Sequence, residues 1–137
     1  MNLLKSIQLT CMASFFLTGL AQALPCDGYV LKVNNKLADN LLVSSISFRG
    51  GDIQPGGLQL LKANTTQAFT VNGTSENSMA GHFEFHTLTL KKVRINYTLF
   101  NNGDKCDHVF SPVADNDYTV EVSAPHDKIV DYTIINK

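Results

Sequence analysis

The sequence has no tryptophan, only 4 prolines and a charged fraction of 17%. Its 11 basic and 12 acidic residues nearly cancel, so no excess of positive charge indicates binding to nucleic acid, and we expect none. Disorder is excluded because 44% of the 137 residues are hydrophobic and can form a core. The length corresponds to one domain. No catalytic motif stands in the sequence at full strength, so composition alone assigns no function.

Long hydrophobic runs are missing except at the N-terminus. Lys5 supplies a positive charge, residues 7–20 are mostly apolar, and residues 21–23 (Ala-Gln-Ala) have the small-x-small form of a signal peptidase site. This pattern predicts a signal peptide at residues 1–23 and an exported mature domain at residues 24–137, secreted or periplasmic. Nothing later reaches 18 consecutive apolar residues, so we do not expect an integral membrane protein.

Cysteine is scarce. Cys11 leaves with the predicted signal peptide, and Cys26 and Cys106 remain in the mature chain. A metal site or a reactive thiol needs closer spacing or a neighbouring base, whereas an even pair in an oxidising compartment is typical of a disulfide. We therefore predict a Cys26–Cys106 bridge. It closes a loop of about 81 residues and contributes about 4 to 5 kcal/mol to stability on the chain-entropy model.

A helical period is also absent from the mature chain, where hydrophobic residues alternate with a period of two. Successive side chains of a strand point to opposite faces, so this pattern predicts strands with one apolar face. Turn residues follow about every ten residues, as in sandwiches and barrels. The prediction is one all-β domain, an antiparallel β-sandwich of about eight strands with one disulfide. The alternating runs lie at residues 29–34, 42–49, 69–71, 92–99, 118–123 and 130–134.

One stretch breaks this alternation. Phe83 and Phe85 have one parity, and Leu88 and Leu90 have the other. A single strand cannot bury both pairs on one face. The sequence therefore predicts either a bulge near His86 or the residue after it, or a strand that crosses between the sheets.

Histidine is rare, with 4 residues, yet two lie in one short motif. In a strand, His82, Glu84 and His86 project from one face. Two imidazoles and a carboxylate are ligands for zinc or copper, and they also suit acid–base catalysis. Ligands on one flat strand diverge, so a closed metal site requires another ligand, such as His108 or His126. The alternative is a polar strand face with no cofactor.

The basic cluster Lys91, Lys92 and Arg94 follows this motif. Three such charges on one hairpin are typical of a solvated face, and they also suit an anionic lipid head group or a glycan sulfate. In a hydrolytic version of the histidine motif, Lys92 or Arg94 would stabilise a phosphate.

Two long segments, 50–57 and 72–81, are rich in Gly, Ser and Asn and almost uncharged. A rigid sandwich often binds its partner through such loops, although long surface loops are also tolerated without a role. Asn-x-Thr sequons begin at Asn64, Asn72 and Asn96, and they matter only in a host that glycosylates. The candidate partner-binding residues are Gly50, Gly51, Asp52, Asn72 and Asn77.

The order of these features resembles the aegerolysin family of small secreted β-sandwich proteins. The likeness consists of an opening strand that ends in Asn34-Asn35, the segment Asp52-Ile53-Gln54-Pro55-Gly56, and a Ser/Asn-rich stretch at 74–78 that leads into Gly81. Members of the family bind membrane lipids, and some recruit a pore-forming partner. The resemblance thus implies a β-sandwich and a lipid ligand.

Three functions remain open at this point. The leading hypothesis is an exported, non-enzymatic module that binds a protein, glycan or lipid of a host surface through its loops. The second is a metal-binding or small hydrolytic protein centred on His82, Glu84 and His86. The third is a secreted enzyme inhibitor that inserts the loop 50–57 into the cleft of its target.

Overall fold

A computed structural model describes residues 23–75 and 77–137, so the predicted signal peptide, apart from Ala23, lies outside the described residues. In these ranges the chain forms ten strands and no helix. No segment among them qualifies as a helix that could span a membrane. The strands are β1 (Tyr29–Asn35), β2 (Leu41–Arg49), β3 (Asp52–Gln54), β4 (Leu60–Leu61), β5 (Thr65–Asn72), β6 (Ser78–His86), β7 (Lys92–Asn102), β8 (Lys105–Ala114), β9 (Tyr118–Val122) and β10 (Ile129–Asn136).

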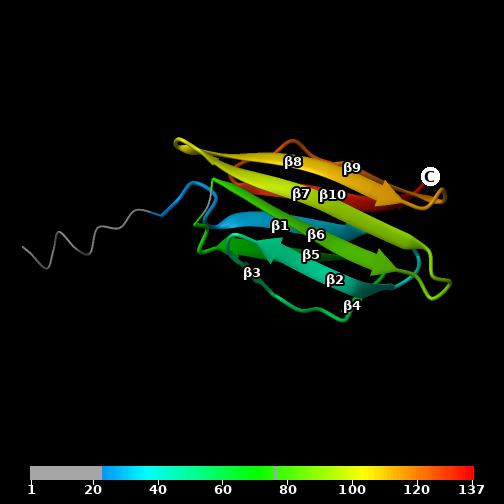
Figure 1. The fold of residues 1–137 in the computed structure, drawn as a ribbon. Helices are drawn as coiled ribbons and strands as arrows, with labels where there is room; N and C mark the ends of the chain where they lie inside the picture. Colours follow the sequence, from blue (N-terminus) through cyan, green and yellow to red (C-terminus); the bar gives the residue numbers. More distant parts are fainter. Residues whose placement is uncertain (1–22, 76) are drawn as a thin grey trace, which may run out of the picture.

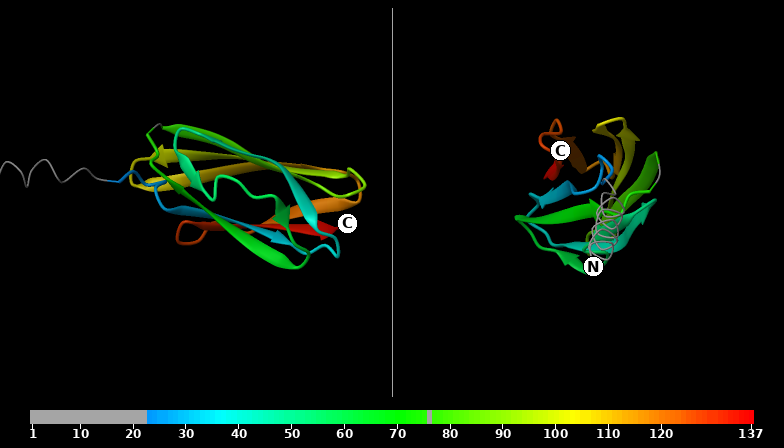
Figure 2. Two further views of the ribbon diagram at one scale, coloured as in Figure 1. Left: turned by 90° about the horizontal axis from the view of Figure 1, so that it is seen from below. Right: turned by 90° about the vertical axis from the view of Figure 1, so that its left-hand side faces the viewer.

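The strands form two sheets of five, which pack face to face (Figures 1 and 2). Sheet A has the order β3-β5-β1-β10-β9, and sheet B has the order β4-β2-β6-β7-β8. This arrangement confirms the predicted all-β sandwich. The structure differs from the prediction in two details, since it adds short strands and pairs β1 with β10 in parallel.

The core lies between the sheets and follows the period of two. Every second residue of β1, β7 and β10 is buried, because alternate side chains point inward. Phe83 of sheet B occupies the middle of this core. Its ring centroid lies 4.5 Å from that of Phe69 in the opposite sheet and 5.2 Å from that of Tyr97. The two sheets are therefore joined by a cluster of aromatic rings.

The predicted bulge near His86 is wrong. Strand β6 ends at His86, and the Thr87 amide donates to the Lys91 carbonyl (2.9 Å) to close a turn. Leu88 and Leu90 lie in that turn and are 85% and 73% exposed. They do not have to be buried on the same face as Phe83 and Phe85, so the strand needs no bulge.

The bulge is in β2 instead. Val43 pairs with Phe85 and Ser45 pairs with Glu84, so Ser44 is an extra residue in this strand. The bulge leaves Leu41, Val43 and Ile46 packed with the core. It also leaves Ser44 and Ser45 near the histidines of the outer face, because their hydroxyls bond His86 and His82.

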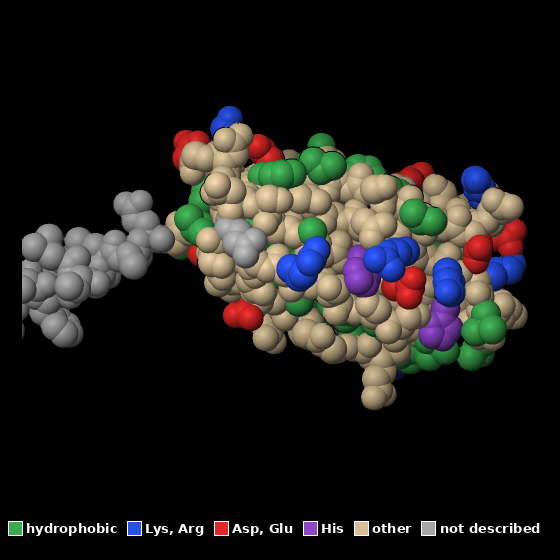
Figure 3. Space-filling view, viewed as in Figure 1, with side chains coloured by type: hydrophobic (Ala, Val, Ile, Leu, Met, Phe, Trp, Pro, Cys, Tyr) green, Lys and Arg blue, Asp and Glu red, His purple; other side chains and the backbone are tan. Residues whose placement is uncertain are grey.

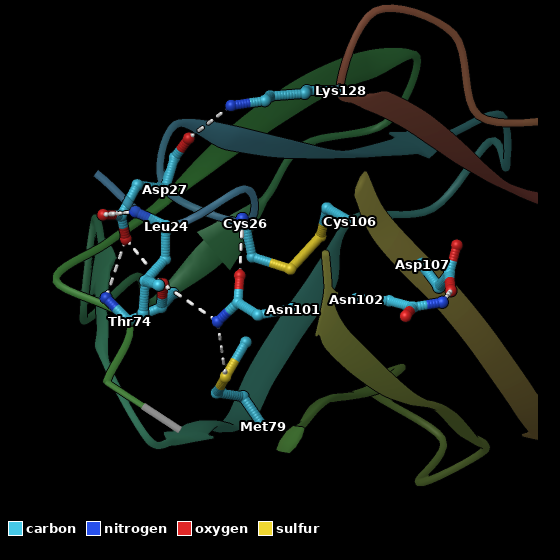
Figure 4. The surroundings of a disulfide bond; sticks show 10 residues. All are labelled: Leu24, Cys26, Asp27, Thr74, Met79, Asn101, Asn102, Cys106, Asp107 and Lys128. Atoms are coloured by element: carbon cyan, nitrogen blue, oxygen red, sulfur yellow. Dashed lines mark hydrogen bonds between the residues drawn. A yellow bond between two sulfur atoms is a disulfide. The ribbon is translucent and has the colours of Figure 1, made fainter. Parts of the chain in front are cut away.

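The Cys26–Cys106 disulfide is confirmed (Figure 4). It ties the segment before β1 of sheet A to β8 of sheet B. The Cys26 amide donates to the Asn101 side-chain oxygen (2.8 Å), which holds the segment against the end of β7. The bridge thus fastens the two layers at one end of the sandwich.

Candidate functional site: a cationic stripe on sheet B

The outer surface of sheet B carries most of the polar residues that the sequence singles out. Strand pairing sets Ser47, His82 and Asn96 side by side, and likewise Ser45, Glu84 and Arg94. Figure 3 shows Lys, Arg and His side chains following one another along this surface, with an acidic group among them. We call this row the cationic stripe. Its residues are Arg49, His82, Glu84, His86, Lys92 and Arg94.

His82 is held by two hydrogen bonds. Its Nδ1 lies 3.3 Å from Nη2 of Arg94, and its Nε2 lies 2.6 Å from Oγ of Ser45. A guanidinium can only donate, so Nδ1 accepts and the Nε2–H group donates to Ser45. Burial, and secondarily the charge of Arg94, lower the pKa of His82. His82 is therefore neutral at pH 7, and the Ser45 hydroxyl keeps its own proton to donate outward.

Arg94 lies between three outward-facing groups. Its Nη1 is 3.6 Å from Oε1 of Glu84, and its Nε donates to Oδ1 of Asn96 (2.8 Å). Glu84 compensates part of the charge of Arg94. These contacts fix the guanidinium plane in one orientation. A planar guanidinium binds carboxylate, sulfate and phosphate groups through paired N–H donors.

A shallow hollow of about 370 Å³ lies at one part of the stripe. Gly81 contributes no side chain there, and a Cβ at this position would lie 2.5 Å from both the Ser47 carbonyl oxygen and the Tyr97 hydroxyl. Only glycine fits between these two groups. The hollow is lined by Ser47, Arg49, Ala80, Gly81, His82, Arg94, Asn96, Tyr97 and Thr98.

A second hollow, of about 410 Å³, involves the turn between β6 and β7. Asp39 is its one charged lining residue. An acid among short polar and apolar side chains offers few groups that fix a ligand. We therefore place the candidate site on the stripe. The second hollow is lined by Ala38, Asp39, Asn40, Thr87, Leu88 and Thr89.

The structure does not bring a further metal ligand to His82, Glu84 and His86. Among residues 23–75 and 77–137, no group of three or more His, Cys, Asp or Glu side chains could hold a metal ion. His108 bonds the Tyr132 hydroxyl, away from the stripe, and His126 lies beside the start of β10. The residues on which the metal hypothesis depended thus bond serines and Arg94 instead.

The same bonds argue against nucleophilic catalysis by Ser45. A Ser-His-Asp arrangement needs a carboxylate at Nδ1 of the histidine, so that Nε2 accepts the serine proton. Here Arg94 occupies Nδ1, and Nε2–H donates to Ser45. His82 therefore orients the Ser45 hydroxyl by donating to its oxygen, and in this arrangement His82 cannot accept the proton of Ser45.

The predicted basic cluster is divided. The Lys91 Nζ atom bonds the Asp117 carboxylate beside β9, whereas Lys92 and Arg94 remain on the stripe. Arg49 joins them from β2. The alternation with Ser45 and Ser47 already placed Arg49 on the wet face, but only the strand order β2-β6-β7 brings it into line with His82.

The candidate binding loops converge at the end that carries the disulfide. The Ser75 amide donates to the Gly50 carbonyl (3.1 Å), and the Asn101 amide donates to the Asn77 carbonyl (2.9 Å). Asp52 and Asn72 are paired in the ladder of β3 and β5, so these two residues are strand rather than loop.

The Asp27 carboxylate anchors the same end (Figure 4). Its Oδ1 accepts the amide and the hydroxyl of Thr74, at 2.8 and 2.7 Å. These bonds lower the pKa of Asp27. The loop that follows β5 is thereby fixed to the N-terminal segment.

His108 is a half-buried group that the sequence did not single out beyond its ligand chemistry. It lies against Tyr29, Phe110 and Tyr132, and its Nε2 bonds the Tyr132 hydroxyl. Burial lowers the pKa of His108 to about 4. One feature of the sequence could have indicated this position. His108 is two residues after Cys106, so in a strand both side chains point toward the opposite layer, where Cys106 is bonded to Cys26.

Titration of His108 predicts a loss of stability in acid. Below its ordinary value of 6.5 the unfolded chain binds the proton, whereas the folded chain does so only near pH 4. Stability is therefore complete above pH 6.5 and falls between pH 6.5 and 4, by about 1 to 2 kcal/mol once solvent screening is allowed for. Urea denaturation across this window should show a flatter profile for His108→Gln. The exposed His126→Gln is the control, and an equal flattening there would contradict the assignment.

No protein-family model matches this chain, and no curated protein matches it. The resemblance to aegerolysins stays a prediction.

Proposed function

We propose that this protein is an exported, non-enzymatic binding module that holds an acidic polysaccharide along the cationic stripe. The observation that carries the proposal is the row of outward donors on sheet B. Positive charge comes from Arg49, Lys92 and Arg94. Ser45 adds a hydroxyl that accepts a hydrogen bond from His82, so its O–H group remains available to donate to a ligand. Such donors are the groups that bind sulfates and carboxylates.

The shape of the stripe supports an extended ligand. It runs from Arg49, which pairs with Ala80, to the level of His86, which is about 20 Å at the usual rise per residue of a strand. A single small anion would occupy only the hollow near Arg94. A chain of acidic sugars could instead contact successive charges along the strands.

The chemistry of the stripe favours a polysaccharide over a nucleic acid or a lipid. Single-stranded nucleic acids stack on aromatic rings, and the stripe offers only the two imidazoles, each already bonded to a serine. A lipid site needs large apolar groups that enter the bilayer, whereas the stripe residues are polar and are flanked on this face by two valines of β8, Val109 and Val113. Export is supported by the predicted signal peptide and by the disulfide, which forms in oxidising compartments.

Binding should depend on two exposed cations. Replacing Arg49 and Lys92 together by glutamine is expected to weaken binding of a heparin oligosaccharide about tenfold, because two charge-assisted contacts are lost. Calorimetry with the mature domain at low ionic strength would measure it. The control variant Lys32→Gln/Lys62→Gln has the same net charge but is changed in β1 and in the segment before β5.

Three results would contradict the proposal. The first is no binding of heparin or of a polyuronate at low ionic strength. The second is equal weakening in the control variant. The third is binding to anionic phospholipid vesicles but not to either polysaccharide, which would favour the lipid ligand that the aegerolysin resemblance implies.

A second candidate is a protein partner at the disulfide end, as in the inhibitor hypothesis. The observation in its favour is the convergence of the segments around Gly50 and Asn77 on that end. These segments are fixed by backbone hydrogen bonds, and a loop that is already rigid loses little entropy when it binds.

A further inference from the structure

Strand β8 (Lys105–Ala114) forms an open edge of sheet B. It pairs with β7 along its whole length, and within the described residues no strand pairs with its other side. The strands at the other three edges, β3, β4 and β9, have 3, 2 and 5 residues, whereas β8 has 10. A long open edge is a template for another strand.

This edge also exposes apolar side chains. Val109, Phe110 and Val113 are 56%, 41% and 60% exposed. Large apolar side chains on an open edge strand mark an interaction surface, because edges that stay single are usually short or charged. Three such residues within one strand therefore call for a partner.

The backbone groups that face the open side follow from the ladder. The Asp115 amide donates to the Lys92 carbonyl of β7 (3.1 Å). The backbone N–H and C=O groups of alternate residues bond to the same neighbouring strand. The backbone groups of Val113 and of the other odd-numbered residues therefore point toward β7. The backbone groups of the even-numbered residues, from Cys106 to Ala114, point toward the open edge. Pro112 is among them, where its missing N–H costs no bond within sheet B, although a strand added on this side receives no hydrogen bond from that position.

We propose that β8 pairs antiparallel with β8 of a second copy, about a two-fold axis at Phe110. In this register Lys105 lies opposite the partner's Asp115, so the strand ends carry complementary charges. Phe110 lies opposite the partner's Phe110. Val109 lies diagonally next to the partner's Val113, within the range at which cross-strand side chains interact.

Neighbouring registers are less favourable. A shift in one direction places Asp107 opposite the partner's Asp115, which sets like charges against each other. A shift in the other direction places Lys105 opposite the partner's Val113 and loses the ion pair. Of these neighbouring registers, only one sets Lys105 at the start of β8 against the acid that follows its end, and this self-complementarity favours a second copy as the occupant.

The pairing does not depend on the ligand of the stripe, but it would affect its binding. A two-fold axis perpendicular to the continuous sheet keeps the outer surfaces of both B sheets on the same side. The two cationic stripes would then share one surface, and a long ligand could contact both, which raises its overall affinity.

Analytical ultracentrifugation of the mature domain tests the proposal. The wild type is expected to dimerise at concentrations up to about 100 µM, as small interfaces do. Val109→Asp/Val113→Asp should weaken dimerisation at least tenfold, because in this register it sets an aspartate opposite the partner's Asp107 and places like charges on both strands. The control Leu88→Asp/Leu90→Asp changes the net charge equally, removes two apolar side chains that are more exposed still from the β6–β7 turn, and should leave the dimer unchanged.

Cysteine cross-linking tests the register. Residues that face each other in a hydrogen-bonded pair have Cα atoms about 5.5 Å apart, within disulfide range. Under mild oxidation, Phe110→Cys should therefore form a covalent dimer faster than Val109→Cys or Ser111→Cys. A monomer at every concentration, a dimer that survives Val109→Asp/Val113→Asp, faster cross-linking at either neighbour, or pairing only with a different protein would each overturn the proposal.

Discussion

Replacing Cys26 and Cys106 together by alanine is expected to lower the free energy of unfolding by about 4 to 5 kcal/mol. The two residues are 80 positions apart, so the bridge restricts most of the unfolded mature chain. It also joins sheet A to sheet B at one end. Since domains of this size have a net stability of about 5 to 15 kcal/mol, the variant should lose a large part of it.

Urea denaturation of the double variant and of the wild type would measure this loss. Wild type kept in a strong reductant provides the control, because it lacks the bond but keeps both side chains. The reduced wild type and the variant should have similar midpoints. A loss below about 1 kcal/mol would show that the unfolded chain is restricted by other contacts.

Phe83→Ala should have an effect of comparable size. The ring is fully buried, and its centroid lies within 6.4 Å of those of Phe69, Phe85, Tyr97 and Tyr132. Truncation removes buried apolar area and leaves a cavity that β-sheets on both sides cannot close. We expect a loss of about 3 to 5 kcal/mol in the free energy of unfolding.

Leu88→Ala is the matched control for this variant. It truncates a large apolar side chain on the same hairpin, but Leu88 lies in the exposed turn. Its effect should stay within about 0.5 kcal/mol. Equal losses in the two variants would mean that the rings around Phe83 do not form the centre of the core.

The strands with one apolar face were predictable from the sequence. Val93, Ile95, Tyr97 and Leu99 alternate with polar residues and are all buried in β7. Strand β8 was missed for a physical reason. As an edge it exposes Val109 on one parity and Phe110 on the other, so neither face is uniformly apolar. Which of its side chains are buried depends on its position at the edge of sheet B, and the local sequence does not reveal that position.

The candidate site was predictable in part. The motif at His82, Glu84 and His86 does share one face, as the period of two requires. Its bonding partners could not be predicted, because Ser45 and Arg94 reach it from neighbouring strands whose order is a property of the whole fold. Long-range pairing also decided which loops became strands, as Asp52 and Asn72 show.

The bulge in β2 separates the outer surface of sheet B from its interior. Without Ser44, strand β2 would still alternate regularly, and Leu41, Val43 and Ile46 would still point inward. Removing this one residue would therefore keep the inward positions in place, yet it would take away the hydroxyl that bonds His86. One extra residue in a strand can thus give the outer surface of a sheet a further polar group while the pattern of inward side chains is kept.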